Sequence, residues 1–139
     1  RALLPVDRHA AAAVAALFAD PGVFGEVEVP QVFPLGDRWA MLFCTARHAT
    51  IDGVQATWNG THYFLADSPY GPFTLAPEPL LLADDRGSLY AARAILDPWL
   101  GNFVMAFRRH DAHGQFAGDL IDPIPLIVDP AAGRLSILP

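Results

Sequence analysis

The chain has 139 residues, of which 53% are hydrophobic and 17% charged, so it can build a folded core and is not a disordered chain. Its formal net charge of −6 comes without any cluster of basic residues, which excludes a nucleic-acid partner. No apolar run reaches the roughly 18 residues that a transmembrane helix needs, so we expect no membrane partner.

The first predicted element is a short helix within residues 1–22. Asp7 is a suitable N-cap for the alanine-rich run 9–18, and the sequence Asp-Pro-Gly at 20–22 ends it. Few of these residues are large enough to fill a core. We therefore interpret the helix as a peripheral packing element.

Residues 23–139 have the pattern of an all-β fold. Short apolar and β-branched runs alternate with turns formed by many of the 13 prolines and 11 glycines. Asn59-Gly60 predicts a type I′ hairpin that joins the strands 54–58 and 62–66. The predicted strands are 27–33, 39–45, 54–58, 62–66, 73–75, 89–95, 103–107, 115–119, 125–128 and 135–138.

The spacing of these strands fits a sandwich or a β-propeller. A propeller blade is a four-stranded antiparallel sheet of about 40–50 residues, so the chain holds about three blades. A closed propeller needs at least about four blades. Residues 1–139 are therefore expected to form one partial β-propeller domain, with the helix at 1–22 and the blades at 23–139.

Cys44 is the single cysteine, which excludes an internal disulfide and a cysteine-rich zinc site. It lies in the apolar run 42–45, and we interpret it as a small core residue. The chain starts at Arg1 and shows no signal peptide, so processing has removed the true start or the sequence is an excerpt. Secreted and cytoplasmic locations both stay open.

Residues 27–33 place a carboxylate at the start of an apolar strand, where a rigid scaffold can hold it. Their sequence, Val-Glu-Val-Pro-Gln-Val-Phe, resembles the Trp-Glu-Cys-Pro-Asp-Leu-Phe motif of glycoside hydrolase family 32, the invertases, inulinases and levanases. The glutamate, the proline and the phenylalanine match. In that family the glutamate is the acid/base of a retaining furanosidase, so the resemblance assigns this role to Glu28. The alternative is a solvated carboxylate at a strand end.

Two later segments extend the resemblance. Residues 85–91, Asp-Arg-Gly-Ser-Leu-Tyr-Ala, resemble the Asp-Tyr-Gly-Lys-Phe-Tyr-Ala segment of the same family. Residues 68–73, Ser-Pro-Tyr-Gly-Pro-Phe, resemble a Ser-Pro-x-Gly-Pro-Phe segment that is frequent in the related family 43 arabinanases and xylosidases. The resemblance runs from about residue 26 to about residue 125 and implies the later blades of a five-bladed propeller.

Three further residues are candidates for binding a sugar. Asp85 is placed to hydrogen-bond a sugar hydroxyl, the alternative being a turn aspartate before Gly87. Arg47 and Trp58 are candidates for a hydrogen-bond donor and a stacking platform, the alternative being packing at strand ends. The sequence His-Asp-Ala-His at 110–113 is interpreted as a solvated loop, so we expect neither a metal nor a cofactor.

The sequence also departs from family 32. Its Asn-Asp-Pro-Asn-Gly segment, which carries the nucleophile, and its Arg-Asp-Pro motif are both missing here. A retaining mechanism needs two carboxyl groups about 5–5.5 Å apart. We therefore expect the isolated chain to be inactive and the nucleophile to come from chain outside this sequence.

Three functions remain in competition. The first is a β-fructofuranosidase-like fragment with a carbohydrate substrate, and the second is a family 43-like arabinofuranosidase or xylosidase. The third is a non-catalytic carbohydrate-binding or self-associating module. Because missing blades leave an apolar face open, we expect self-association or a missing N-terminal half.

Overall fold

A computed structural model describes residues 27–45, 49–51, 54–56, 60–84 and 87–138, with only the backbone described at 49–51 and 54–56. These residues form eleven strands and no helix. The strands are β1 (Glu28–Leu35), β2 (Arg38–Thr45), β3 (Ala49–Ile51), β4 (Val54–Ala56), β5 (Gly60–Ala66), β6 (Thr74–Ala83), β7 (Leu89–Asp97), β8 (Gly101–His110), β9 (Phe116–Leu120), β10 (Ile124–Asp129) and β11 (Arg134–Ile137).

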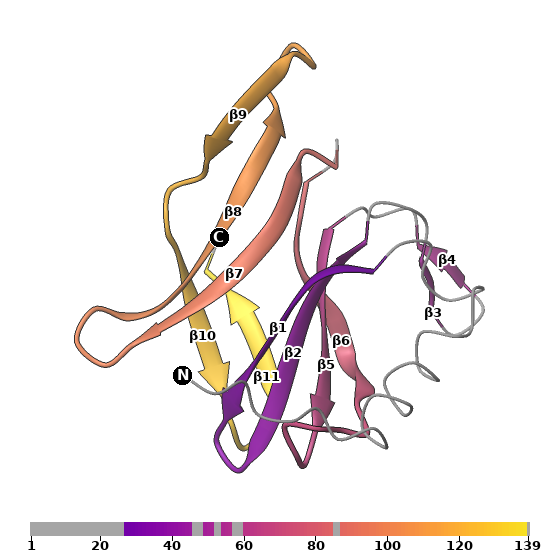
Figure 1. Cartoon of the computed structure of the whole chain (residues 1–139), viewed down its shortest axis with the longest axis vertical. Helices are drawn as coiled ribbons and strands as arrows, with labels where there is room; N and C mark the ends of the chain where they lie inside the picture. Colours follow the sequence, from indigo (N-terminus) through magenta and orange to yellow (C-terminus); the bar gives the residue numbers. More distant parts are fainter. Residues whose placement is uncertain (1–26, 46–48, 52–53, 57–59, 85–86, 139) are drawn as a thin grey trace, which may run out of the picture.

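Two antiparallel meanders make up most of the fold (Figure 1). The first sheet has the order β1-β2-β5-β6, and the second has the order β7-β8-β10-β11 with β9 paired to β8. The short hairpin β3-β4 is a separate two-stranded sheet inserted between β2 and β5. Each meander has the size and topology of a propeller blade.

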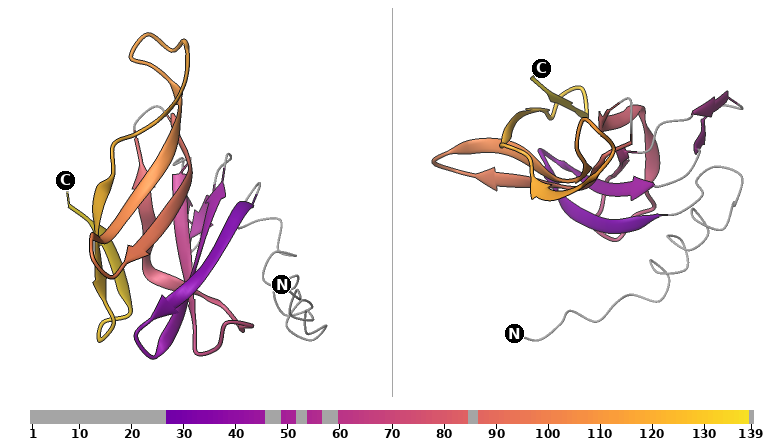
Figure 2. Two further views of the ribbon diagram at one scale, coloured as in Figure 1. Left: turned by 60° about the vertical axis from the view of Figure 1, so that its left-hand side comes forward. Right: turned by 90° about the horizontal axis from the view of Figure 1, so that it is seen from above.

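The two sheets lie face to face, as Figure 2 shows. Strand β7 contacts all four strands of the first sheet and therefore crosses them, while β11 contacts β6. The expected all-β partial propeller is therefore confirmed, and the described residues form two blade-sized sheets and a hairpin where about three blades were expected.

The hairpin predicted at Asn59-Gly60 is wrong. Strand β4 pairs with β3, whereas β5 pairs with β2 and β6, so the strands on either side of the Asn-Gly sequence belong to different sheets. Long-range pairing with β2 and β6 decides the place of the buried strand β5, and Asn59 itself lies outside the described residues. The predicted helix at 1–22 lies outside the described residues.

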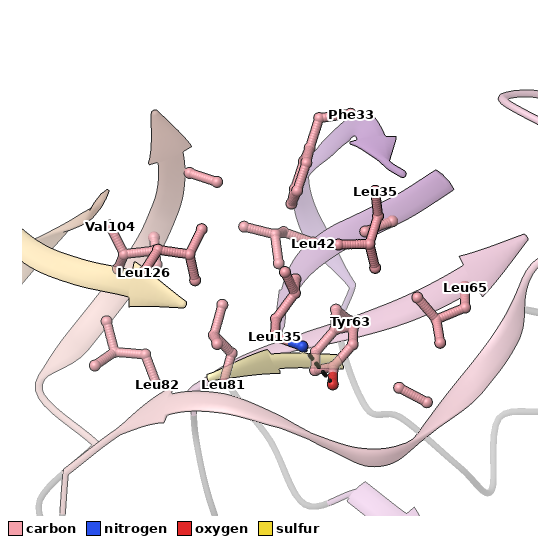
Figure 3. Close-up of a cluster of buried hydrophobic side chains, with 14 of the residues drawn as sticks. Phe33, Leu35, Leu42, Tyr63, Leu65, Leu81, Leu82, Val104, Leu126 and Leu135 are labelled. Atoms are coloured by element: carbon pink, nitrogen blue, oxygen red, sulfur yellow. Dashed lines mark hydrogen bonds between the residues drawn. The ribbon is translucent and has the colours of Figure 1, made fainter. Parts of the chain in front are cut away.

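Apolar side chains from both sheets form the core between them (Figure 3). Tyr63 spans this core, and its hydroxyl accepts a hydrogen bond from the main-chain N–H of Leu135 at 3.2 Å. The residues that β7 and β8 turn toward the core are small, which lets the sheets approach closely. The buried cluster consists of Phe33, Leu35, Ala40, Leu42, Tyr63, Leu65, Ala76, Leu81, Leu82, Ala92, Ala94, Val104, Ala106, Leu126 and Leu135.

The second sheet also has an apolar face that points away from this core. Because Val104 and Ala106 are in the core, strand alternation turns Phe103, Met105 and Phe107 to the opposite side. Ile127 is 43% exposed and alternates with the buried Leu126. We call the surface formed by Ile95, Phe103, Met105, Phe107 and Ile127 the outer face of the second sheet.

Within the described part of the chain, no helix is long and apolar enough to cross a bilayer.

Candidate functional site

The site forms where the first strands of the two sheets begin. Glu28 is the first residue of β1, and Tyr90 is the second residue of β7. The Tyr90 hydroxyl donates a hydrogen bond to Oε2 of Glu28, across 62 positions of sequence and between two sheets. Glu28 is exposed, so this carboxylate is anchored by one oxygen and can still meet a ligand from solvent.

The backbone beside each of these residues is distorted in the same way. In β1 the register slips by one residue between Glu28 and Gln31, and in β7 it slips between Tyr90 and Arg93. Val29 has a φ of 49° and Ala91 a φ of 55°, both in the left-handed region that glycine normally occupies at such bulges. Strained positions of this kind cost about 1–3 kcal/mol and gather at functional sites, where a bulge re-aims a side chain.

A cation lies on the other side of the tyrosine. The Arg109 guanidinium carbon is 5.4 Å from the centre of the Tyr90 ring, which is a cation–π distance. This contact fixes the ring whose hydroxyl bonds to Glu28. A hollow of about 370 Å³ is lined by Asp84 and Ser88, which precede β7, by Arg108 and His110 at the end of β8, and by Asp111 and Ala112, which follow β8. Its carboxylates, hydroxyl and cation are groups that hydrogen-bond neutral polyols.

Hydrogen bonds and an ion pair hold the carboxylates around this hollow in fixed positions. Asp84 accepts hydrogen bonds from the main-chain N–H of Ser88 at 2.6 Å and from its hydroxyl, which fixes the turn into β7. Arg108 and Asp119 form a two-bond ion pair across β8 and β9. The side-chain hydrogen bonds and charge of Arg108 lower the pKa of the Asp119 carboxyl below its ordinary value. Asp119 is therefore ionised throughout the neutral range.

The seam between β1 and β7 is closed by side chains rather than by a main-chain ladder. The Gln31 side-chain amide donates to the carbonyl of Ala94 at 2.8 Å and accepts from its N–H at 2.9 Å. The Cys44 sulfur accepts a hydrogen bond from the N–H of Ala91 at 3.0 Å. Arg93 donates to the carbonyl of Pro30 at 3.0 Å.

The other predicted site residues fall outside the described part of the chain. This is the case for Asp85, Arg47 and Trp58, so their proposed contacts with a sugar stay predictions. Glu28 stands at the strand start that its motif indicated. Tyr90 belongs to the 85–91 segment that carried the resemblance, but sequence reasoning gave it no role.

The sequence 110–113 forms a turn between β8 and β9. The carboxylate of Asp111 accepts hydrogen bonds from the main-chain N–H groups of His113, at 2.8 Å, and Gln115, at 2.9 Å. Over the described ranges, no three histidine, cysteine or acidic side chains gather in a way that would hold a metal ion.

Cys44 is a buried free thiol, as predicted, and it has a second role that the sequence did not indicate. Its Cα pairs with that of Glu28 across β1 and β2, and its sulfur lies 3.0 Å from the hydroxyl oxygen of Thr61. Cys44 thus connects the strand pair that carries Glu28 to the strand that carries Tyr90.

No family model matches the sequence, and no curated protein gives a significant match. The fold, however, resembles solved levansucrases. Bacillus subtilis levansucrase matches with a TM-score of 0.62 at 17% identity, over 84% of this chain and 28% of the levansucrase. A levansucrase variant complexed with sucrose and a B. subtilis variant in complex with oligosaccharides both match with a TM-score of 0.63 at 16% identity.

The chain thus spans 28% of the length of the levansucrases it matches. Levansucrase is a five-bladed β-propeller fructosyltransferase of glycoside hydrolase family 68. The fold therefore resembles part of the five-bladed propeller of levansucrase, and the neighbours are family 68 rather than family 32 enzymes.

Proposed function

We propose that this chain is part of a retaining, fructoside-processing propeller enzyme in which Glu28 is the general acid/base. The observation that carries the proposal is the Glu28 carboxylate, exposed at a strand start and held by the Tyr90 hydroxyl. The fold shared with levansucrases, of which variants were solved with sucrose and with oligosaccharides, supports a fructosyl-type substrate.

The chemistry follows from the two oxygens of the Glu28 carboxyl group. Tyr90 occupies Oε2 and sets the plane of the group, which leaves Oε1 for proton transfer to a bound substrate. In the first step the protonated group gives its proton to the leaving glycosidic oxygen, and in the second the carboxylate takes a proton from the incoming hydroxyl. An incoming water gives hydrolysis, and an incoming sugar hydroxyl gives transfer.

The nucleophile of this mechanism is supplied by another part of the propeller, because the motifs that carry it in family 32 are missing from the sequence. The isolated chain is accordingly inactive as a glycosidase. The outer face of the second sheet supports the same view: its Ile127 is 43% exposed, and Phe116 of β9, whose ring centre lies 6.2 Å from that of Phe107, is 76% exposed. In a complete propeller the next blade covers such a face.

Two other functions make different predictions. A family 43-like enzyme uses the same fold on arabinofuranosides or xylosides, and the Ser-Pro-Tyr-Gly-Pro-Phe sequence at 68–73 favours it. A non-catalytic carbohydrate-binding or self-associating module binds sugar or itself without any turnover. Turnover of sucrose, inulin and arabinan by a propeller that joins this chain to nucleophile-bearing blades separates the three.

The acid/base role is tested by the leaving group in such an assembled propeller. Glu28→Gln should lower turnover of sucrose by about 10²–10⁴-fold. It should spare the first step with fructosyl fluoride, because fluoride leaves without a proton. Glu78→Gln is the matched control, since Glu78 is exposed and pairs with Arg134 at 3.3 Å. Equal losses on both substrates would show that Glu28 is not the proton donor.

A further inference from the structure

The Glu28–Tyr90 contact joins two different sheets, so its geometry depends on how these sheets are fastened at that edge. In the described part of the chain, the main-chain ladder of β1 is made only with β2 and that of β7 only with β8. We propose that Gln31 is the positioning residue that fastens them, because its side-chain amide acts as a short piece of extra strand along β7. This proposal rests on the proposed role of Glu28.

The hydrogen bonds of Gln31 are those that a neighbouring strand would make. The amide both donates to the Ala94 carbonyl, at 2.8 Å, and accepts from the Ala94 N–H, at 2.9 Å. Two antiparallel bonds to one residue define the distance between the strands and also their offset along the strand direction. An apolar side chain of the same size defines neither.

The burial pattern of β1 shows that an amide here is an exception. Gln31 shares the inward face of β1 with Phe33 and Leu35, which are buried in the core. A polar group in such a row is stable only when its hydrogen bonds are made, and the main chain of Ala94 makes them. Ala94 lies in β7, the edge strand of the second sheet. The Gln31 amide pairs the N–H and C=O of Ala94, which no neighbouring strand pairs.

The two hydrogen bonds between Gln31 and Ala94, which we call the bridge, lie close to the site. The bridge lies three residues after Glu28 and four after Tyr90, immediately past the two bulges with positive φ. The Cys44 bond to Ala91 lies between the bridge and the site. The bridge therefore holds the strained segments in the arrangement in which the carboxylate and the phenol meet.

The test uses ¹⁹F NMR of the whole chain labelled with 3-fluorotyrosine, which reports the environment of each of its three tyrosines. Tyr→Phe variants assign the signals. Glu28→Ala gives the Tyr90 signal with the contact broken. Gln31→Leu should move the Tyr90 signal at least half of the way to that position, while the Tyr63 and Tyr70 signals stay in place.

Gln115→Leu, the same change in an exposed turn, is the control and should move none of the signals. Gln31→Glu keeps the acceptor for the Ala94 N–H but loses the donor, so it should give an intermediate shift. It also serves as the deciding variant if Gln31→Leu does not fold, which the loss of the separate Tyr63 signal would reveal.

A Tyr90 signal that stays at its wild-type position in the folded Gln31 variants overturns the proposal. A role of Gln31 in stability alone would lower the unfolding midpoint and leave that signal unmoved. The readout requires no sugar and no turnover. A failure of the proposed function in the leaving-group test is therefore distinguishable from a failure of the bridge.

Discussion

Acidification should destabilise this protein through one buried histidine. His62 lies in β5 in the interior of the first sheet and is fully buried, with its ring stacked 5.7 Å from that of Phe43. Burial lowers the pKa of His62 from 6.5 to about 4, and a hydrogen bond with the main chain of Gly60 opposes only part of this effect. The native protein therefore holds His62 neutral where the unfolded chain binds a proton.

The sign and size of the effect follow from linkage. Above pH 6.5 both states are neutral at this position, so the stability is fully present there. As the pH falls from 6.5 toward 4, the unfolded state alone takes up the proton, and each pH unit costs about 1.4 kcal/mol. Going from pH 7 to pH 5 should remove about 2 kcal/mol, and the total loss should level off at about 3 kcal/mol below pH 4.

Urea unfolding at a series of pH values measures this directly. The midpoint of the wild-type chain should fall by about 1 M between pH 7 and pH 5. Carboxylates also titrate at low pH, so the informative quantity is the difference between the wild type and His62→Leu. A constant offset between the two proteins reflects the changed packing, whereas the histidine-dependent slope should be missing from the variant. Parallel pH profiles for the two proteins would show that His62 does not cause the loss of stability.

Three further predictions concern the core, the strained seam and the outer face. Leu42→Ala should lower the free energy of unfolding by about 2–5 kcal/mol, because Leu42 is fully buried between the sheets; a loss below about 1 kcal/mol in urea unfolding would contradict this packing. Ala91→Gly should be neutral or stabilise the fold by up to about 1 kcal/mol, since Ala91 has a φ of 55°. Ala92→Gly should cost about 1 kcal/mol. Equal losses of stability in the two variants would show that the backbone at Ala91 is not strained. The chain alone should self-associate as its concentration rises, as measured by sedimentation velocity. The double variant Phe116→Ser with Ile127→Ser should weaken the self-association. A monomer at every concentration would count against an uncovered sheet face.

The strands of this fold were largely predictable, since most of them alternate or form apolar runs bounded by turns. Strand β6 was predicted only at 73–75, but it extends through Pro77 and Pro79 to Ala83. A proline has no N–H to donate to a ladder, so Pro77 and Pro79 are unusual inside a strand. In the structure β6 is the edge strand of the first sheet, where missing donors are tolerated.

The site was predictable only in part. The motif at 27–33 indicated Glu28 at a strand start, and the segment 85–91 contained Tyr90, yet nothing in the sequence joined the two. The bridge from Gln31 to Ala94 spans 63 positions and links a side chain to a main chain, so residue types carry no signal for it. Such contacts follow from how the two sheets stack, which only the folded chain shows.

A titration of the ¹⁵N-labelled chain with levan oligosaccharides, followed by NMR, tests most directly whether a sugar binds at the seam between β1 and β7. We expect saturable shifts centred on Glu28 and Tyr90. They should be lost in Tyr90→Phe, which keeps the ring under Arg109 but removes the donor. Arabinan oligosaccharides should bind more weakly if the ligand is a fructosyl unit. Shifts confined to other parts of the chain, or no shifts at millimolar sugar, would contradict a sugar site at this seam.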